Sequence, residues 1–201
     1  MKSGIVTLDV LIKYAEKDDP LGESLYGNSV SGRKYGELAK GVAATIANDQ
    51  GFYLWGKYET NGLWKNIYLG KAGYGKSAHL RARILEELKD ERQFLWRSIF
   101  TNDELLAKGE EYYPSMWVTY KNHWNRALAK TGASHIVWVA TPDLDGPKVP
   151  DIEKDLIETL NPIANRLRAA PPSSLQPFTK EVIGCFRHEI HMNRVMLENK
   201  K

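Results

Sequence analysis

Residues 51–72 read Gly-Phe-Tyr-Leu-Trp-Gly-Lys-Tyr-Glu-Thr-Asn-Gly-Leu-Trp-Lys-Asn-Ile-Tyr-Leu-Gly-Lys-Ala. Two short apolar and aromatic runs, residues 52–55 and 64–69, stand on either side of the pair Asn61-Gly62. An Asn-Gly pair between two such runs is a strong signal for a tight turn between paired strands. The stretch therefore predicts an antiparallel β-hairpin, around which the other elements are arranged.

The segments outside the hairpin show helical and extended patterns. Three of them carry apolar side chains at helical spacing: residues 35–48, 80–88 and 151–160. Ser77 is a suitable N-cap for the second of these helices, and Asn161-Pro162 ends the third. Residues 135–140 are apolar and β-branched, which predicts a strand. We therefore expect an α+β fold with a small mixed or antiparallel three-stranded sheet flanked by helices.

The composition excludes several classes of protein. Hydrophobic residues make up 42% of the chain, enough for a core, yet no run approaches the ~20 apolar residues of a membrane helix. No long apolar run follows Met1, so we expect no secretory signal. Cys185 is the only cysteine, which excludes an internal disulfide and a cysteine-rich zinc module. We expect a cytoplasmic protein that has no contact with a membrane.

Polar side chains suited to phosphodiester hydrolysis fall where the sheet and its helices would meet. Tyr53 and Tyr68 lie on partner strands of the predicted hairpin, and Lys71 follows the second strand. Arg83 lies on the next helix and Glu153 on a later one. A carboxylate can hold a divalent metal, an arginine can bind a phosphate through two donors, and a tyrosine of lowered pKa can activate water. This combination predicts a nuclease site.

The same residues carry a resemblance to a known family. Gly51-Phe52-Tyr53 and Tyr68-Leu69-Gly70 resemble the two halves of the signature of the GIY-YIG nucleases. The continuation through Lys71 and Ala72 is similar to the form in the incision subunit of bacterial nucleotide-excision repair. One predicted helix, with Leu80 three positions before Arg83, resembles the arginine helix of the family. A later segment resembles the metal-binding helix and the residues after it, on Glu153, Leu156, Ile157, Pro162 and Asn165.

The resemblance implies a metal-dependent endonuclease. Glu153 and waters would hold Mg²⁺ or Mn²⁺, and Arg83 would bind the scissile phosphate. Tyr53 and Tyr68 would position or deprotonate the attacking water, and the base between them stays open. Lys71 would favour a tyrosinate nearby, and Asn165 would brace the site.

The resemblance also divides the chain, as one nuclease domain over residues 1–201. Its parts are an N-terminal extension (1–50), a core (51–92 and 134–166), a helical insertion (93–133) and a C-terminal tail (167–201). Residues 17–36, rich in Gly, Ser, Asp and Asn, indicate a loop or a loosely ordered arm within the extension. A single core with such additions is similar to the type II restriction enzymes of the family, which suggests a homodimer, at least on DNA.

Two features depart from the family pattern. The intervals from Tyr53 to Tyr68 and from Tyr68 to Arg83 are longer than usual, and extra loop residues are inexpensive thermodynamically. Many members carry His or Tyr one helical turn after the arginine, whereas this chain has Glu87. His79 and His123 are candidates to supply the missing group.

Double-stranded DNA is the expected partner. The formal charge is +4 over residues 51–100 and +4 over residues 161–201, against −1 and −4 over residues 1–50 and 101–160. Phosphate-binding proteins often cluster lysine and arginine in this way. The side chains expected to contact DNA are Lys76, Arg81, His123 and Arg126.

Other functions fit parts of the sequence. A less specific nuclease of the same family, from phage, defence or repair systems, has the same core. The run from Gly70 to Gly75-Lys76-Ser77 formally matches a phosphate-binding P-loop, which would indicate nucleotide hydrolysis. A nucleic-acid-binding module without cleavage is the third possibility. His188 and His191 lack further metal-ligating residues nearby, which favours a surface role.

Overall fold

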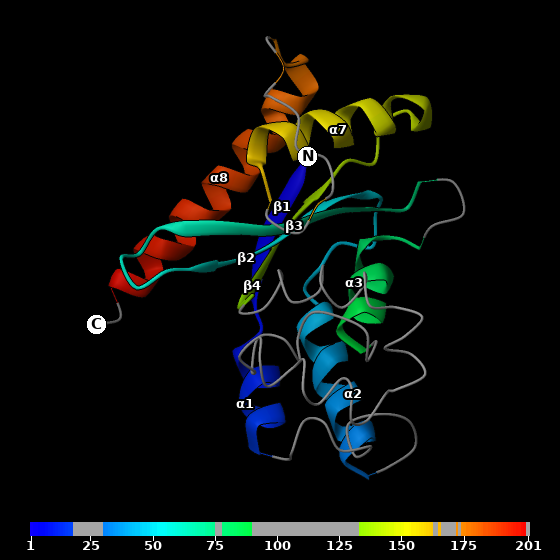
Figure 1. Cartoon of the computed structure of the whole chain (residues 1–201). Coiled ribbons are helices and arrows are strands. Elements are labelled where there is room, and N and C mark those ends of the chain that lie inside the picture. Colours follow the sequence, from blue (N-terminus) through cyan, green and yellow to red (C-terminus); the bar gives the residue numbers. More distant parts are fainter. Residues whose placement is uncertain are drawn as a thin grey trace, which may run out of the picture.

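The computed structural model describes residues 1–17, 30–74, 78–89, 133–162, 165, 172 and 174–199. Within this part, one four-stranded antiparallel sheet has helices on both faces, which confirms the α+β class (Figure 1). The strand order is β1-β4-β2-β3, so β3 lies at an edge.

The predicted hairpin is confirmed as β2 (Gly51–Tyr58) and β3 (Trp64–Ala72). Its turn places Gly62 at a φ of 78°, a backbone conformation that glycine adopts without strain. The pairing sets Tyr53 opposite Gly70 and Trp55 opposite Tyr68, and it shifts by one residue after Trp55. The predicted strand at residues 135–140 is confirmed as β4 (His135–Ala140), which pairs with β2.

The sheet has four strands, not the expected three, because the chain begins with β1 (Lys2–Thr7) paired to β4. Its wholly antiparallel pairing also settles the open choice between a mixed and an antiparallel sheet. Residues 1–17 therefore belong to the packed fold, and only residues 18–29 of the expected arm lie outside the described part.

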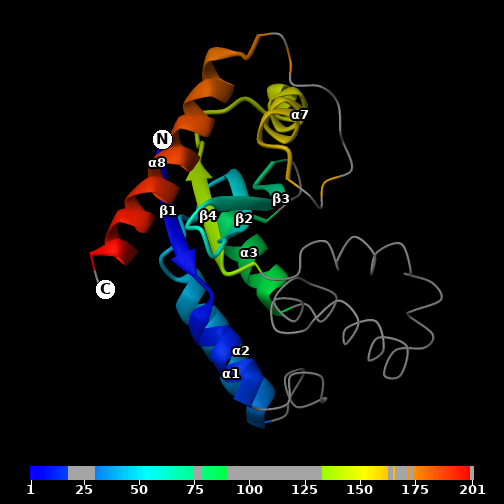
Figure 2. The same cartoon turned by 60° about the vertical axis from the view of Figure 1, so that its left-hand side comes forward.

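Three helices pack on one face of the sheet: α1 (Asp9–Lys17), α2 (Val30–Ala43) and α3 (Leu80–Lys89). Two others cover the opposite face: α7 (Val149–Leu160) and α8 (Pro177–Glu198). Figures 1 and 2 show these two groups of helices on opposite sides of the strands. Because side chains alternate along a strand, Tyr53 and Trp55 face the first group while Phe52 and Leu54 face the second.

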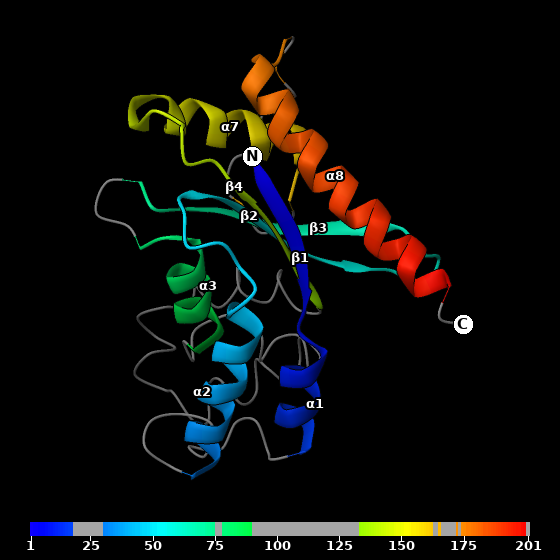
Figure 3. The same ribbon diagram turned by 180° about the vertical axis from the view of Figure 1, so that it is seen from behind.

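The helix boundaries differ from those expected in two places. The helix expected at residues 35–48 spans Val30–Ala43, so it begins inside the segment interpreted as a loop. The expected tail contains the 22-residue α8, whose Val182 and Phe186 are buried against the sheet. Figure 3 shows α8 starting beside the N-terminal end of β1 and running diagonally toward the hairpin. None of the helices in the described part is long and apolar enough to cross a membrane.

The expected helical insertion lies outside the described residues except for Ala133, and so does the expected N-cap Ser77. The helix that carries Glu153 begins at Val149 with a proline in its first turn, two residues before the expected start. It ends at Leu160, and the left-handed backbone of Asn161 (φ 45°) forms the C-cap before Pro162.

Candidate active site

Close packing leaves no room for a side chain at Gly51 or at Gly70. At position 51, a Cβ in place of the glycine hydrogen would overlap the carbonyl oxygen of Val139 on β4. In Gly70, an added Cβ would overlap the ring of Tyr53, which crosses directly over it. The pairing of Tyr53 with Gly70 therefore has a physical reason: the glycine on β3 leaves the space that the tyrosine on β2 fills.

Tyr53 is held in a buried network with α3. Its hydroxyl donates to Oε1 of Glu87 at 2.6 Å, and both residues are only 1% exposed. The same carboxylate oxygen lies 3.1 Å from Nη2 of Arg83, one helical turn earlier. Glu87 thus orients both a phenol and a guanidinium.

Arg83 links this buried network to the surface. Its side chain is 37% exposed, and Nη1 contacts Oε2 of the exposed Glu86 at 3.0 Å. Burial works to lower the pKa of Arg83, but Glu87 and Tyr53 outweigh it and raise that pKa above its ordinary value. The guanidinium is therefore a permanent cation, which the buried Glu87 holds in place and solvent can still reach.

The position of α3 follows from contacts with its neighbours. The buried hydroxyl of Tyr35 on α2 donates to the carbonyl of Leu88 at 2.9 Å. Arg81, expected to contact DNA, is exposed, and its Nε donates to the carbonyl of Ile46 at 2.9 Å. The apolar side of α3 packs against the sheet, so that Glu87 enters the core beside Tyr53.

Tyr68 lies next to Tyr53 on the α3 face of the sheet. Their ring centroids are 6.3 Å apart with the planes at 58°, so the two phenol rings are direct neighbours. Burial and the Glu87 carboxylate raise the pKa of both tyrosines above the usual value of 10.0. The hypothesis of a tyrosinate base needs a lowered pKa, so this environment works against it.

Lys71 and Glu153 form a second group. Nζ of Lys71 lies 2.6 Å from Oε2 of Glu153, and the side chains are 35% and 25% exposed. Lys71 was expected to act on a tyrosine, but the alternation of side chains along β3 turns it to the face opposite Tyr68. Glu153 nevertheless contributes to raising the pKa of Tyr68, so its charge acts across the edge strand.

Asn165 fastens the chain after α7 to the outer edge of β3. Its Oδ1 accepts from the backbone N–H of Leu69 at 2.8 Å, and its Nδ2 donates to the carbonyl of Leu69 at 2.9 Å. Two residues before Tyr68, Nδ2 of Asn66 donates to the carbonyl of Leu160 at 2.7 Å. These bonds satisfy backbone groups at a sheet edge and tie the helix of Glu153 to the strand of Tyr68.

The donors available for a metal are few. Among the residues that the structure describes, no group of three or more His, Cys, Asp or Glu side chains could enclose an ion. Glu153 is a partly exposed carboxylate whose Oε2 contacts Nζ of Lys71. Its other oxygen, Oε1, is not part of that ion pair. Mg²⁺ is commonly held by one or two carboxylates together with waters and substrate phosphates, so this donor set fits Mg²⁺ or Mn²⁺.

The remaining expected residues are placed only in part. Lys76, His123 and Arg126 lie outside the described residues. His79, a candidate to replace the family's histidine or tyrosine, is exposed just before α3. Glu87, one helical turn after Arg83, departs from the pattern of the resembled family, and its buried carboxylate contacts both Arg83 and Tyr53. Its spacing from Leu80 and Ile84 on the buried side of α3 was a signal for an acidic group inside the core.

Comparisons with protein-family models, with curated proteins and with solved structures found no match. The interpretation below therefore depends on the sequence pattern and on the geometry of these residues.

Proposed function

We propose that this protein is a divalent-metal-dependent endonuclease of the GIY-YIG type acting on double-stranded DNA. The observation that carries the proposal is the buried network of Tyr53, Glu87 and Arg83 beside Tyr68. A buried carboxylate that orients a phenol and a partly exposed arginine is costly for stability alone, and such sites are candidates for chemistry.

Arg83 binds the scissile phosphate in this proposal. Its planar fork can donate two hydrogen bonds to phosphate oxygens, and its anchor on Glu87 fixes the direction of that fork. A phosphate can displace the exposed Glu86 carboxylate from Nη1, since an exposed ion pair contributes only about 0–1 kcal/mol to stability.

The proton of the attacking water leaves through a relay of neutral phenols. Water attacks phosphorus and its proton goes to the hydroxyl oxygen of Tyr68, a residue of intermediate burial. In this relay Tyr68 passes its own proton to the neighbouring Tyr53. Tyr53 passes its proton to Oε1 of Glu87, to which its hydroxyl donates. Because each phenol gains one proton as it loses one, neither must ionise against a raised pKa. Glu87 is the final acceptor and thereby fills the role expected of a family histidine or tyrosine.

Glu153 would hold the metal ion, which supplies stabilisation of the negative charge that develops on phosphate oxygens. Lys71 positions the Glu153 carboxylate and balances its charge before the ion binds. Asn165 keeps the Glu153 helix in register with the Tyr68 strand.

Within this class we favour a type II restriction enzyme that acts as a homodimer on DNA. One sheet with α1, α2 and α8 packed on it, and an insertion between α3 and β4, gives a single core surrounded by its own additions. A less specific nuclease of the same type is the near alternative. A cytoplasmic setting also stays a prediction, based on the single Cys185.

Nucleotide hydrolysis by a P-loop is less well supported. A P-loop connects a parallel strand to a helix. Gly70, the first glycine of the formal match, lies inside β3, an antiparallel edge strand, and is covered by the Tyr53 ring. The same glycine is explained by the nuclease signature.

Incubation of supercoiled plasmid with purified protein and Mg²⁺ tests the proposal. Discrete linear fragments support a restriction enzyme, and nicked or smeared products support a less specific nuclease. If the plasmid stays intact although the protein binds it, the result contradicts the proposal that this protein cleaves DNA. Glu153→Gln should abolish cutting and keep DNA binding, whereas Asp151→Asn, an exposed carboxylate on the same helix, should cut normally. Cutting by Glu153→Gln would contradict the metal assignment.

A further inference from the structure

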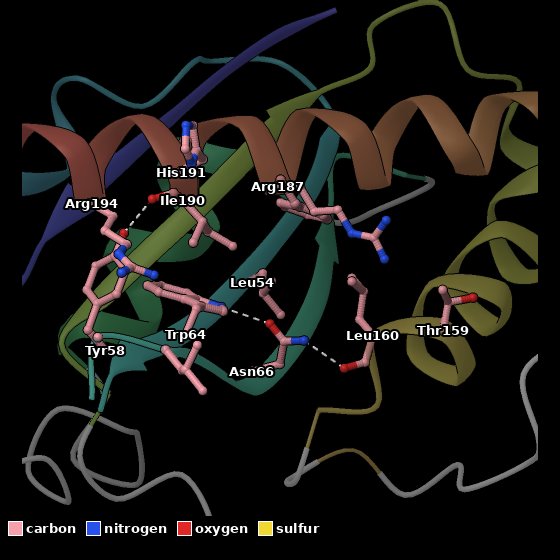
Figure 4. Close-up of a pocket in the computed structure, with 13 residues that line it drawn as sticks. Leu54, Tyr58, Trp64, Asn66, Thr159, Leu160, Arg187, Ile190, His191 and Arg194 are labelled. Atoms are coloured by element: carbon pink, nitrogen blue, oxygen red, sulfur yellow. Dashed lines mark hydrogen bonds between the residues drawn. The ribbon is translucent and has the colours of Figure 1, made fainter. Parts of the chain in front are cut away.

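A pocket of about 350 Å³ lies between the tip of the β2–β3 hairpin, the end of α7 and one side of α8 (Figure 4). It is on the α7 and α8 face of the sheet, away from the network of Tyr53, Glu87 and Arg83. Its apolar lining comes from Leu54, Leu160, Phe186 and Ile190. A volume in this range suits a small molecule or one unit of a polymer.

Two aromatic rings form a fixed wall of the pocket. Trp64 and Tyr58 meet edge to face with centroids 5.0 Å apart. The Tyr58 hydroxyl donates to the carbonyl of Ile190 at 2.7 Å, and Nε1 of Trp64 donates to Oδ1 of Asn66 at 2.8 Å. Figure 4 shows the first of these bonds joining the hairpin to α8 and the second lying within β3. A planar ligand can stack on such a wall without reorganising it.

Asn66 supplies hydrogen-bonding groups in the same wall. Its amide has two N–H donors and two acceptor lone pairs. One donor goes to the carbonyl of Leu160 at 2.7 Å, and one lone pair accepts from Trp64. Within the described part of the chain, one donor and one lone pair are left for a ligand, the combination with which an asparagine pairs to the edge of a base.

The rim of the pocket is basic. Arg187, His191 and Arg194 of α8 line it, and none of the thirteen lining residues is acidic. Arg194 pairs with Glu198 at 2.8 Å, but both side chains are exposed, so the pair exchanges easily for a stronger anion. In Figure 4, Arg187 extends over Leu160 at one end of the pocket and Arg194 lies beside Tyr58 at the other. If a planar ring occupied the pocket, Arg187 or Arg194 could bind an anionic group attached to that ring.

We propose that this pocket binds a nucleotide unit, a heteroaromatic base together with its phosphate. The aromatic wall, the amide of Asn66 and the basic rim each match one part of that ligand. A bare anion would leave the apolar lining without a partner, and a purely apolar ligand would leave the arginines without one. The unit comes either from a free nucleotide or from an unpaired position of a nucleic-acid strand.

The test is a titration of the full chain followed by ¹H–¹⁵N NMR, in EDTA to prevent cleavage. The probes are the four deoxynucleoside 5′-monophosphates, deoxyadenosine and inorganic phosphate. We expect saturable shifts of the Trp64 indole and Asn66 amide signals, with at least tenfold tighter binding of one or more monophosphates than of deoxyadenosine or phosphate. The variant Arg187→Ala with Arg194→Ala should weaken that binding at least tenfold. The matched variant Lys148→Ala with Lys180→Ala, which removes two exposed lysines outside the pocket, should change it less than twofold.

Several results would overturn the proposal: no saturable shift, equal shifts with inorganic phosphate, or equal weakening in the two double variants. Shifts that follow protein concentration instead of added nucleotide would also overturn it, because they would make this face a contact between copies of the chain. A parallel titration with tetrathymidylate separates the two sources. Tighter binding than thymidine monophosphate, on the same signals, identifies a strand, and equal binding identifies a free nucleotide. Glu153→Gln should bind like the unaltered chain, so failure of the nuclease proposal and failure of this one are distinguishable.

Discussion

The buried carboxylate of Glu87 gives the sharpest prediction. Its contacts with the Tyr53 hydroxyl at 2.6 Å and with Nη2 of Arg83 at 3.1 Å use the single oxygen Oε1. An amide oxygen can accept two hydrogen bonds at the same place. Glu87→Gln can therefore keep both contacts while it removes the charge and places an NH2 group where the buried Oε2 lies. Glu87→Ala removes the contacts as well.

The magnitudes follow from burial. A hydrogen bond to a charged group contributes about 1.5–3 kcal/mol and a neutral one about 0.5–1.5 kcal/mol. Loss of charge at two bonds, partly offset by a smaller desolvation cost, destabilises Glu87→Gln by about 1.5 kcal/mol. Removing one partner of a buried pair costs about 3–5 kcal/mol. Because Arg83 is 37% exposed, Glu87→Ala lies near the lower limit, at about 3 kcal/mol.

Glu86 provides a matched control on the same helix and the same arginine. Its carboxylate lies 3.0 Å from Nη1 of Arg83 but is 63% exposed, so Glu86→Gln should cost less than about 0.5 kcal/mol. Urea unfolding measures all three variants. With a slope of about 2 kcal/mol/M, Glu87→Gln should lower the midpoint by roughly 0.7 M at unchanged slope. Equal midpoints for Glu86→Gln and Glu87→Gln would refute the assignment of Glu87 as a buried charge. Glu87→Gln should also slow plasmid cleavage at least tenfold if the relay ends there.

Three further predictions concern packing, the sheet edge and pH. Gly70→Ala should destabilise the fold by about 2–3 kcal/mol in urea unfolding, because its Cβ would overlap Tyr53. Gly184→Ala, in open space on α8, should stabilise the fold by about 0.5–1 kcal/mol. Similar effects of the two substitutions would contradict the close packing at Gly70. Asn165→Ala should cost about 1–3 kcal/mol and speed amide exchange along β3, and unchanged exchange would show that the edge does not depend on it. Burial lowers the pKa of His135 below its usual 6.5, so the unfolded chain binds the proton first, and stability should fall as the pH drops below about 6.5. His135→Phe should flatten the pH dependence of the urea midpoint over that range, and an unaltered dependence would contradict this sign.

Local signals in the sequence determined the centre of the fold. The apolar runs and the Asn61-Gly62 turn identified β2 and β3, β-branched residues identified β4, and helical spacing identified α3 and α7. In each case the evidence lies within a few residues along the chain, because turn chemistry and side-chain periodicity are local properties. The α+β class followed from the order of these elements.

The tertiary structure decided how distant segments meet. Residues 2–7 became a fourth strand through pairing with residues 135–140, and no local pattern specifies a partner so far along the chain. The same holds for the site. Tyr53 and Arg83 were candidates from their motifs, but only the packing of α3 on β2 brought Glu87 between them and raised the pKa of the phenols. Only the face alternation of β3 and the position of α7 paired Lys71 with Glu153. A sequence states which groups are present, whereas burial and partners, which set their charge and reactivity, arise from contacts between residues far apart in the chain.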